Sequence, residues 1–350
     1  MMLTSRQLLI LQLTVNDFIE SAHPVGSRQL SKKPEAPFSP ATIRNEMADL
    51  EDMGLLEKTH TSSGRIPSEK GYRYYVDHLL KPERLNEREK AFVRSLFDEH
   101  VIASESIIQK TADVLSDLTN YTSILLGPNT SKHRVKKFEI VPLNENVAVA
   151  IVVTDTGRVE NRMFQVPQHL HVADIEKLVN ILNEQLVGTP LNQVQRKLRT
   201  EVDEILRVHV HEAEILLQSL YQAMHIEDEN QVFFGGKFNM MKQPEFHDVD
   251  QVELLFDVID DASTSLFFRD GEGVNVRIGS ENDHDAMENC SIITANYSLG
   301  GDSIGSLAII GPTRMDYSRT ITILDVMSRH LSKELSQLMY GEVLTRRNES

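Results

Sequence analysis

The sequence predicts an α+β protein with a helical unit at its N-terminus, followed by an α+β domain that is divided along the chain. Three observations lead to this prediction. Apolar residues follow helical spacing through most of residues 1–80, strand-like segments occur in two later blocks, and a stretch of helical period separates these blocks. The length of 350 residues is sufficient for two or three domains.

The N-terminal unit begins with three predicted helices. Thr4 can cap the first, in which apolar residues recur at helical spacing, and Ser27 can cap a short second helix. Ser39 followed by Pro40 is a strong start for the third helix, because serine is a good N-cap and proline fits the first helical position. Gly54 is expected to end this helix.

A hairpin is predicted directly after these helices. Two strand-like segments, 55–59 and 65–67, flank a tight polar turn, and Ser68 can cap a fourth helix. Three helices followed by a two-stranded hairpin is the order of a winged helix-turn-helix, in which one helix reads the major groove of DNA. A small helical domain with no nucleic-acid role is the alternative.

The remainder of the chain is predicted to form one α+β domain that an inserted helical domain splits. Residues 81–90 are dense in charge and predict a linker, after which a long helix is expected from about 86 to 119. Helical spacing returns from 169 to about 224, and residues 233–236 interrupt it. Two independent α+β domains are the alternative, which the small number of strands in each block disfavours. The strands are expected at 123–126, 135–141, 147–154, 159–166, 265–269, 274–278, 291–297 and 303–310, and a final amphipathic helix at 316–339.

Charge is distributed unevenly along the chain. The net charge of −16 argues against nucleic-acid binding only if it is spread uniformly. Residues 24–44 and residues 58–73 each carry a net charge of +3, because each stretch has four basic residues and one acidic residue. A polyanion docks where the local field is positive, so these two stretches predict a nucleic-acid surface on an otherwise acidic protein.

The sequence also predicts where the protein resides. The longest purely apolar run, residues 147–153, is far too short to span a bilayer, and polar residues interrupt the N-terminal helix. Cys290 is the only cysteine, which excludes an intramolecular disulfide and a multi-cysteine metal site. We therefore expect a protein of the reducing cytoplasm that does not associate with membranes.

The third helix is the predicted reader of DNA bases. Opposite its apolar stripe it presents small and hydrogen-bonding side chains. Asn can bond adenine, and Arg can bond guanine, with two hydrogen bonds each. We therefore expect Thr42, Arg44 and Asn45 to contact base edges, and Ser39 to position the helix on the DNA backbone. An ordinary solvated helix face is the alternative.

The hairpin is expected to add a second set of DNA contacts. Its tip combines hydroxyls, free backbone N–H groups and one guanidinium, which can bond phosphates or place an arginine in the minor groove. Basic residues on either side of the tip are expected to contact flanking phosphates and to cause much of the salt dependence. The tip residues are Ser62, Ser63, Gly64 and Arg65, and the flanking residues are Lys58, Lys70 and Arg73.

No catalytic site, metal site or cofactor is expected. The histidines within residues 209–214 lack the spacing of a helical zinc site, and are more simply surface residues. Residues 235–237 and 271–273 are incomplete phosphate-binding loops and predict turns. Residues 283–285 are better interpreted as a polar loop than as a metal site, and Cys290 as a buried, inert thiol.

A set of longer sequence motifs is distributed over the whole chain. In the N-terminal part they are ATIRNEMADLE at 41–51, GLL at 54–56, SGRIP at 63–67 and GYRYYVD at 71–77. In the C-terminal part they are PEF at 244–246, IGSEN at 278–282 and GPTRMDY at 311–317. Together these motifs resemble those of HrcA, a family of bacterial heat-shock repressors.

The resemblance implies an architecture and a function. The implied parts are a winged-helix domain at 1–80, a linker at 81–90, and a GAF-like domain at 91–168 and 247–343, which a mainly helical dimerisation domain at 169–246 interrupts. The implied function is repression of chaperone operons by a homodimer that binds an inverted-repeat operator, the CIRCE element. The implied partner is the chaperonin, which helps the repressor reach its active fold and is drawn away by unfolded protein under heat stress. A regulator that senses a small ligand in the GAF-like domain is the alternative function.

Overall fold

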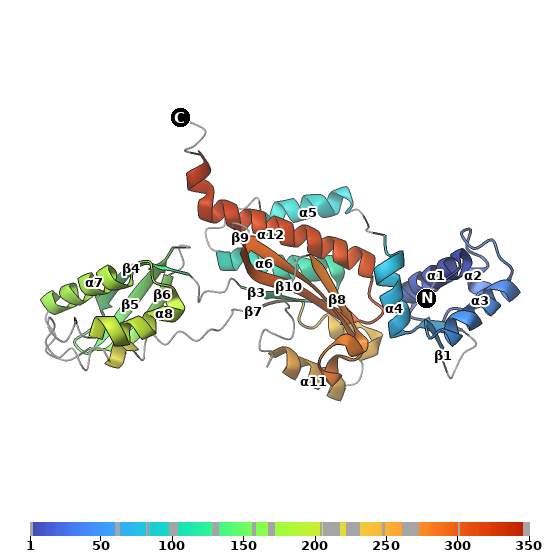
Figure 1. Ribbon diagram of the computed structural model, residues 1–350, viewed down its shortest axis with the longest axis horizontal. Helices are drawn as coiled ribbons and strands as arrows, with labels where there is room; N and C mark the ends of the chain where they lie inside the picture. The colour runs from blue at the N-terminus through green and yellow to red at the C-terminus, as the bar shows by residue number, and fades with distance from the viewer. Residues whose placement is uncertain are drawn as a thin grey trace. The chain divides into compact units, whose positions relative to one another are not determined.

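The computed structural model describes residues 3–345, except for 60–63, 82, 84, 98–103, 128–132, 156–158, 167–171, 204, 206–217, 222–231, 247–248, 261–272 and 300–301. The chain divides into two compact units (Figure 1). Unit 1 comprises Met1–Gly127 and Val232–Leu338, and unit 2 comprises Pro128–Gln231 with Met339–Ser350. No helix among the described residues is long and apolar enough to cross a membrane.

The N-terminal part of unit 1 has the predicted three helices and hairpin. Its elements are α1 (Ser5–Ser21), α2 (Ser27–Leu30), α3 (Pro40–Asp52), β1 (Leu56–Lys58), β2 (Arg65–Pro67) and α4 (Glu69–Tyr74). The predicted caps Thr4, Ser39 and Ser68 each accept a hydrogen bond from a backbone N–H of the first turn. Ser27 lies inside α2, whose N-cap is Gly26, because the backbone becomes helical at the serine.

The charged segment 81–90 is not a free linker in this structure. The Lys81 carbonyl accepts a hydrogen bond from Ser318 Oγ, the Leu85 side chain is buried, and α5 (Glu87–Phe97) begins within the segment. The prediction of one long helix from about 86 to 119 is wrong, because α5 and α6 (Ser104–Thr119) are separate helices that contact each other. One straight helix cannot fold back on itself in this way.

In the rest of unit 1 the described residues form an antiparallel sheet with five strands in the order β7-β3-β10-β9-β8. The strands are β3 (Thr122–Leu126), β7 (Val232–Gly235), β8 (Val274–Ile278), β9 (Cys290–Leu299) and β10 (Asp302–Pro312). Residues 233–236 are predicted to interrupt the pattern, but the first three of them belong to the edge strand β7, which pairs with β3. This pairing joins segments more than a hundred residues apart, so no local pattern announces it. The strand expected at 265–269 lies outside the described residues.

Helices cover both faces of this sheet (Figure 1). Successive residues of a strand point to opposite faces, so Leu307 and Ile309 pack in the core of α6 and α12 (Tyr317–Thr345), whereas Ala308 and Ile310 pack in the core of α11 (Val249–Asp260). The first of these cores also contains the buried residues of α1 and α3. The winged-helix part and the sheet domain of unit 1 thus share one continuous apolar core.

Unit 2 contains a three-stranded antiparallel sheet in addition to its helices. The strands β4 (Val135–Pro142), β5 (Val147–Thr154) and β6 (Val159–Gln165) pair in that order, and the described helices include α7 (Val172–Leu186) and α8 (Leu191–Lys197). One sheet face packs against α7, with Phe138 and Leu182 fully buried between them.

The boundaries of unit 2 differ from those expected. The inserted part is predicted at 169–246, whereas the compact unit spans 128–231. The reason is that β4, β5 and β6 pair with one another and pack under α7, rather than joining the five-stranded sheet. The sequence patterns of these segments specify strands, but they do not specify the sheet to which each strand belongs.

Candidate nucleic-acid interface

The start of α3 is held by its own cap. Ser39 Oγ accepts a hydrogen bond from the Thr42 N–H at 3.1 Å and lies 2.9 Å from Thr42 Oγ1. Ile43 turns into the core, and this orientation leaves Arg44 and Asn45 exposed to solvent. The first two turns of α3 therefore present the side chains that the sequence predicts as base readers.

Basic residues from neighbouring elements neutralise two acidic residues of α3. Glu46 accepts a hydrogen bond from Arg6 of α1 at 3.1 Å. Glu51, one turn further along, forms an ion pair with Arg65 of β2 at 2.6 Å. These pairs hold the carboxylates to the sides of the helix, where they repel an approaching polyanion less than free carboxylates would.

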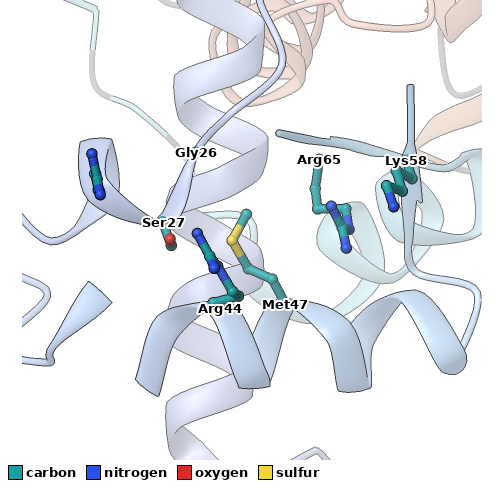
Figure 2. Close-up of a pocket in the computed structure, with 7 residues that line it drawn as sticks. Gly26, Ser27, Arg44, Met47, Lys58 and Arg65 are labelled. Carbon is teal, nitrogen blue, oxygen red and sulfur yellow. The ribbon is translucent and has the colours of Figure 1, made fainter. Parts of the chain in front are cut away.

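A basic hollow of about 350 Å³ opens between α2, α3 and the hairpin (Figure 2). Figure 2 shows Arg44 rising from α3 toward this hollow, with Lys58 and Arg65 approaching it from the hairpin. Arg28, Arg44 and Lys58 form no ion pair within the described part of the chain. The described residues that line it are Gly26, Ser27, Arg28, Arg44, Met47, Lys58 and Arg65, which include four cations and no acid.

The base of the hairpin is fastened to the loop before α2. Val25 and Arg65 exchange two backbone hydrogen bonds, both of 2.9 Å. Gly64 packs so closely that a Cβ atom there would lie 2.8 Å from the backbone of Pro24. A side chain at residue 64 would push the hairpin away from this loop, so glycine keeps the two sides of the hollow together.

Most of the described candidate residues lie on this side of the winged helix. Arg44, Lys58 and Arg65 line the hollow, and Ser39, Thr42 and Asn45 stand on the adjoining part of α3. Lys70 lies at the other end of α3, where its Nζ donates to the Met53 carbonyl at 2.9 Å. Ser62 and Ser63 fall outside the described residues.

Sequence reasoning missed Arg28 as a member of this site. The residue belongs to the basic stretch 24–44, but α2 has only four residues and gives no helical face to interpret. The hollow assigns it a place beside Arg44 because the loop before α2 is tied to the hairpin.

Arg73, which the sequence predicts as a phosphate contact, does not line the basic hollow and bonds other residues of unit 1 in this structure. Its Nε donates to Glu281 at 2.7 Å, and its Nη2 donates to the Val276 carbonyl at 2.7 Å. The hydrogen bond to Glu281 is the main cause that raises the pKa of Arg73. The reason for the difference is that this face of α4 packs against β8 of the same unit.

The other chemical candidates are accounted for differently. Asp283 forms an ion pair with Arg277 at 3.6 Å, and His284 Nδ1 accepts a hydrogen bond from the Ala286 N–H. The described residues contain no group of three or more potential metal ligands. Cys290 is fully buried, and burial raises the pKa of its thiol to about 12. Residues 209–214 and 271–272 fall outside the described part of the chain.

The sheet face beneath α11 has an apolar filling. Ile292 and Ile310 from the sheet meet Phe246 and Leu255 from the covering segments, and all four are at most 6% exposed. Such packing stabilises the domain, whereas a ligand pocket is a cavity to which a few polar groups converge.

Comparisons with known proteins bear on the whole chain. A family model described as "HrcA protein C terminal domain" matches residues 105–321. The heat-inducible transcription repressor HrcA of Bacillus pumilus (strain SAFR-032) is 53% identical over 340 residues, covering 96% of this chain and 99% of that protein. Heat-inducible transcription repressor HrcA of Lysinibacillus sphaericus is 52% identical over 339 residues, with the same coverage. A crystal structure described as a hypothetical protein shares the fold, with a TM-score of 0.70, 24% identity, and coverage of 96% of this chain and 100% of that one.

Proposed function

The chain belongs to the HrcA family of heat-inducible transcription repressors, and from this premise we propose that it represses chaperone operons by binding an inverted-repeat operator of the CIRCE type. The observation that carries the proposal is the basic hollow beside α3. Arg28, Arg44 and Lys58 place unpaired positive charge, within the described residues, next to the exposed helix face that bears Asn45. Sequence-specific binding of duplex DNA requires both contacts to phosphates and contacts to base edges.

Each residue of the surface has a proposed task. Arg44 and Asn45 read base edges in the major groove together with Thr42, because they stand on the exposed first turns of α3. Arg28 and Lys58 bind phosphates on the two sides of the hollow. The remaining contacts are proposed to be those of Ser39, Ser62, Ser63, Gly64, Arg65 and Lys70 with the DNA backbone or the minor groove.

We further propose that unit 2 makes the repressor a dimer. An inverted repeat presents the same surface twice, so its two half-sites call for a two-fold protein. The sheet face of unit 2 that points away from α7 has a row of facing apolar residues, Val141, Val149 and Met163. Met163 is 72% exposed, and Val159 on the same face is 56% exposed. A second copy would bury this face.

The remaining features of the proposal rest on family membership. We propose that the protein works in the cytoplasm without a catalytic step or a cofactor, and that chaperonin increases the fraction of chains able to bind DNA. Such a partner needs only to shift an equilibrium between competent and incompetent forms by a few kcal/mol, on the order of 100-fold or more in population. The apolar filling beneath α11 favours this regulation over a small-ligand sensor in the sheet domain.

The experiment for DNA binding is a gel-shift titration of a CIRCE duplex and a scrambled duplex at fixed salt, with and without chaperonin. We expect preference for the CIRCE duplex and a larger active fraction after refolding with chaperonin. Equal affinity for both duplexes would contradict the proposed function. Active-fraction titration with excess DNA separates a change in affinity from a change in the amount of folded repressor.

The experiment for the dimer is sedimentation of Met163→Asp with Val187→Asp as the matched control. Both substitutions put a charge on an exposed apolar residue of unit 2, but Val187 follows α7 and lies outside the open sheet face. We expect only Met163→Asp to become a monomer and to lose its preference for the full inverted repeat. A dimeric Met163→Asp variant would place the interface elsewhere.

A further inference from the structure

Three C-terminal motifs take no part in the basic surface, yet two of them contact the winged-helix part of unit 1 and the third forms an ion pair with one of these two. They are PEF at 244–246, IGSEN at 278–282 and GPTRMDY at 311–317. Each contributes a side chain or a turn that meets α1 or α4, directly or through one neighbour. Figure 1 shows α4 next to the β8 end of the sheet domain.

The turn at 278–282 receives two side chains from α4. Glu69 accepts hydrogen bonds from the N–H and the Oγ of Ser280, at 3.2 and 2.5 Å. Arg73 bonds Glu281 and the carbonyl of Val276. Residues four apart lie on the same face of a helix, so Glu69 and Arg73 of α4 both contact the turn.

The turn is shaped to allow this approach. Gly279 has φ +55°, and a Cβ atom there would lie 1.9 Å from Glu69 Oε1. Asn282 Nδ2 donates to the carbonyls of Gly279 and Cys290, at 2.8 and 2.9 Å. The turn is therefore held by its own hydrogen bonds before α4 reaches it, and glycine leaves room for the glutamate.

The other two motifs hold α1 and the centre of α4. Arg314 forms an ion pair with Glu245, and its Nη1 donates to the carbonyl of Ile19 at 3.2 Å. Ile19 lies in the last turn of α1, where carbonyls lack helical partners and a positive charge is favourable. The ring of Tyr317 packs near the ring of Tyr72, with 5.8 Å between the two ring centroids.

We propose that Glu245, the 278–282 turn, Arg314 and Tyr317 form an intramolecular dock that fixes the direction in which the winged-helix part faces. This inference rests on the proposed binding of an inverted repeat by a dimer. Two recognition helices can engage both half-sites at once only if their separation matches the separation of the half-sites. When both parts are fixed, the second half-site binds at a high effective concentration, and when the winged helix can swing, much of that advantage is lost.

The dock predicts a specific separation of effects. Releasing the winged helix leaves its basic hollow and α3 intact, so binding to a single half-site should hardly change. Affinity for the full repeat should fall, and the preference for the natural spacing of the half-sites should weaken. A direct role of Arg73 at a phosphate would instead weaken half-site binding and reduce the salt dependence.

The test uses the full chain with Gly279→Ala and Arg73→Gln. Gly273→Ala is the matched control for the first, because Gly273 also has a positive φ, +83°, but a Cβ atom there would meet none of the described neighbouring atoms within 4 Å. Arg196→Gln of unit 2 is the charge-matched control for the second. The probes are a CIRCE duplex, a single half-site duplex, and duplexes whose half-sites are moved apart by a few base pairs.

We expect both dock variants to lose affinity for the CIRCE duplex by about tenfold and to bind the half-site within about twofold of the unmodified protein. They should also discriminate less between natural and altered spacing, while both controls behave as the unmodified protein does. Equal losses on the full repeat and the half-site, or an unchanged preference for spacing, would overturn the dock.

A measurement without DNA separates this proposal from the proposed function. Hydrogen exchange of peptides that cover α4 and residues 276–282 should become faster in both dock variants and remain slow in the controls. If the unmodified protein shows no preference for the CIRCE duplex but the variants and controls show this exchange pattern, DNA repression is refuted while the dock stands. Unchanged exchange in both variants would refute the dock whatever the DNA result.

Discussion

The guanidinium of Arg65 lies against the carboxylate of Glu51, with two of its nitrogens 2.6 Å from Oε2. Glu51 belongs to the last turns of α3, and Arg65 begins β2. The ion pair thus connects the helix proposed to read bases with the hairpin proposed to touch the flanking groove. It also offsets the charge of an arginine that lines the basic hollow, so a DNA phosphate must compete with a carboxylate for it.

Glu51→Gln is expected to strengthen binding to all DNA sequences. The substitution keeps the size of the side chain but removes the carboxylate charge that Arg65 faces, so the dependence of log K on log salt should become steeper by about one unit. Asp52→Asn is the control, because it removes the same charge from the next residue, which is exposed and does not bond Arg65. Equal salt slopes for the two variants would show that Glu51 does not restrain Arg65.

Arg44→Ala and Lys58→Ala are expected to differ in what they lose. Arg44→Ala removes a bidentate contact to a base, so the binding free energy should weaken by about 1–3 kcal/mol on the operator and by much less on scrambled DNA. Lys58→Ala removes a phosphate contact, so binding to all DNA sequences should weaken alike and the dependence of log K on log salt should become shallower by about one unit. Competition titrations with operator and scrambled duplexes distinguish these results. Equal weakening of both duplexes by Arg44→Ala would make Arg44 a phosphate contact.

The sequence predicted those parts of the fold that depend on neighbouring residues. The caps Thr4, Ser39 and Ser68 are correct because an N-cap needs only a side-chain oxygen and an N–H two or three residues later. The burial of Ile43 and the exposure of Arg44 follow in the same way from helical period. Strand patterns located β4, β5 and β6 correctly for the same reason.

Features that depend on distant residues were not predictable from such patterns. The sequence of β4 does not determine that it pairs with β5 under α7 rather than joining the larger sheet, so the boundary of unit 2 was not predicted. Arg73 has the spacing of a phosphate ligand, but its partner Glu281 comes two hundred and eight residues later. Arg28 enters the hollow only because distant backbone at Arg65 bonds Val25.

Tyr72→Phe is expected to stabilise unit 1. The Tyr72 hydroxyl is buried and has no hydrogen-bond partner among the described residues, and burial is the main cause that raises its pKa well above the usual value. Removing an unsatisfied buried hydroxyl should gain about 1 kcal/mol, which is about 2–4 °C in Tm for a unit of this size. A calorimetric scan of both proteins measures this shift.

Tyr317→Phe is the matched control for this change. Its hydroxyl lies 2.7 Å from Ser291 Oγ and donates to the Thr313 carbonyl at 2.5 Å, so its removal leaves buried groups unsatisfied and should lower Tm. Since both rings meet in the dock, the two variants should also shift the temperature at which operator binding is lost, in opposite directions. A lower Tm for Tyr72→Phe would mean that the hydroxyl has a partner, such as a buried water.

Cys290 is expected to report the opening of unit 1 without any engineered probe. It is the only cysteine of the chain and is fully buried at the start of β9, so a thiol reagent should modify the native protein slowly and the heated protein quickly.

Burial raises the pKa of the Cys290 thiol to about 12, whereas an unfolded cysteine has a pKa of about 8.5. The native state therefore holds the proton more tightly. This contribution to stability is complete below about pH 8.5 and is lost progressively as the pH rises toward the native pKa. Cys290→Ala should remove that part of the alkaline destabilisation, measured as the change in urea midpoint between neutral pH and pH of about 10. Its stability at neutral pH should be lower, because the smaller side chain leaves a cavity beneath α11. Rapid, stoichiometric labelling of the folded protein at room temperature, or an unchanged alkaline shift in Cys290→Ala, would contradict this assignment.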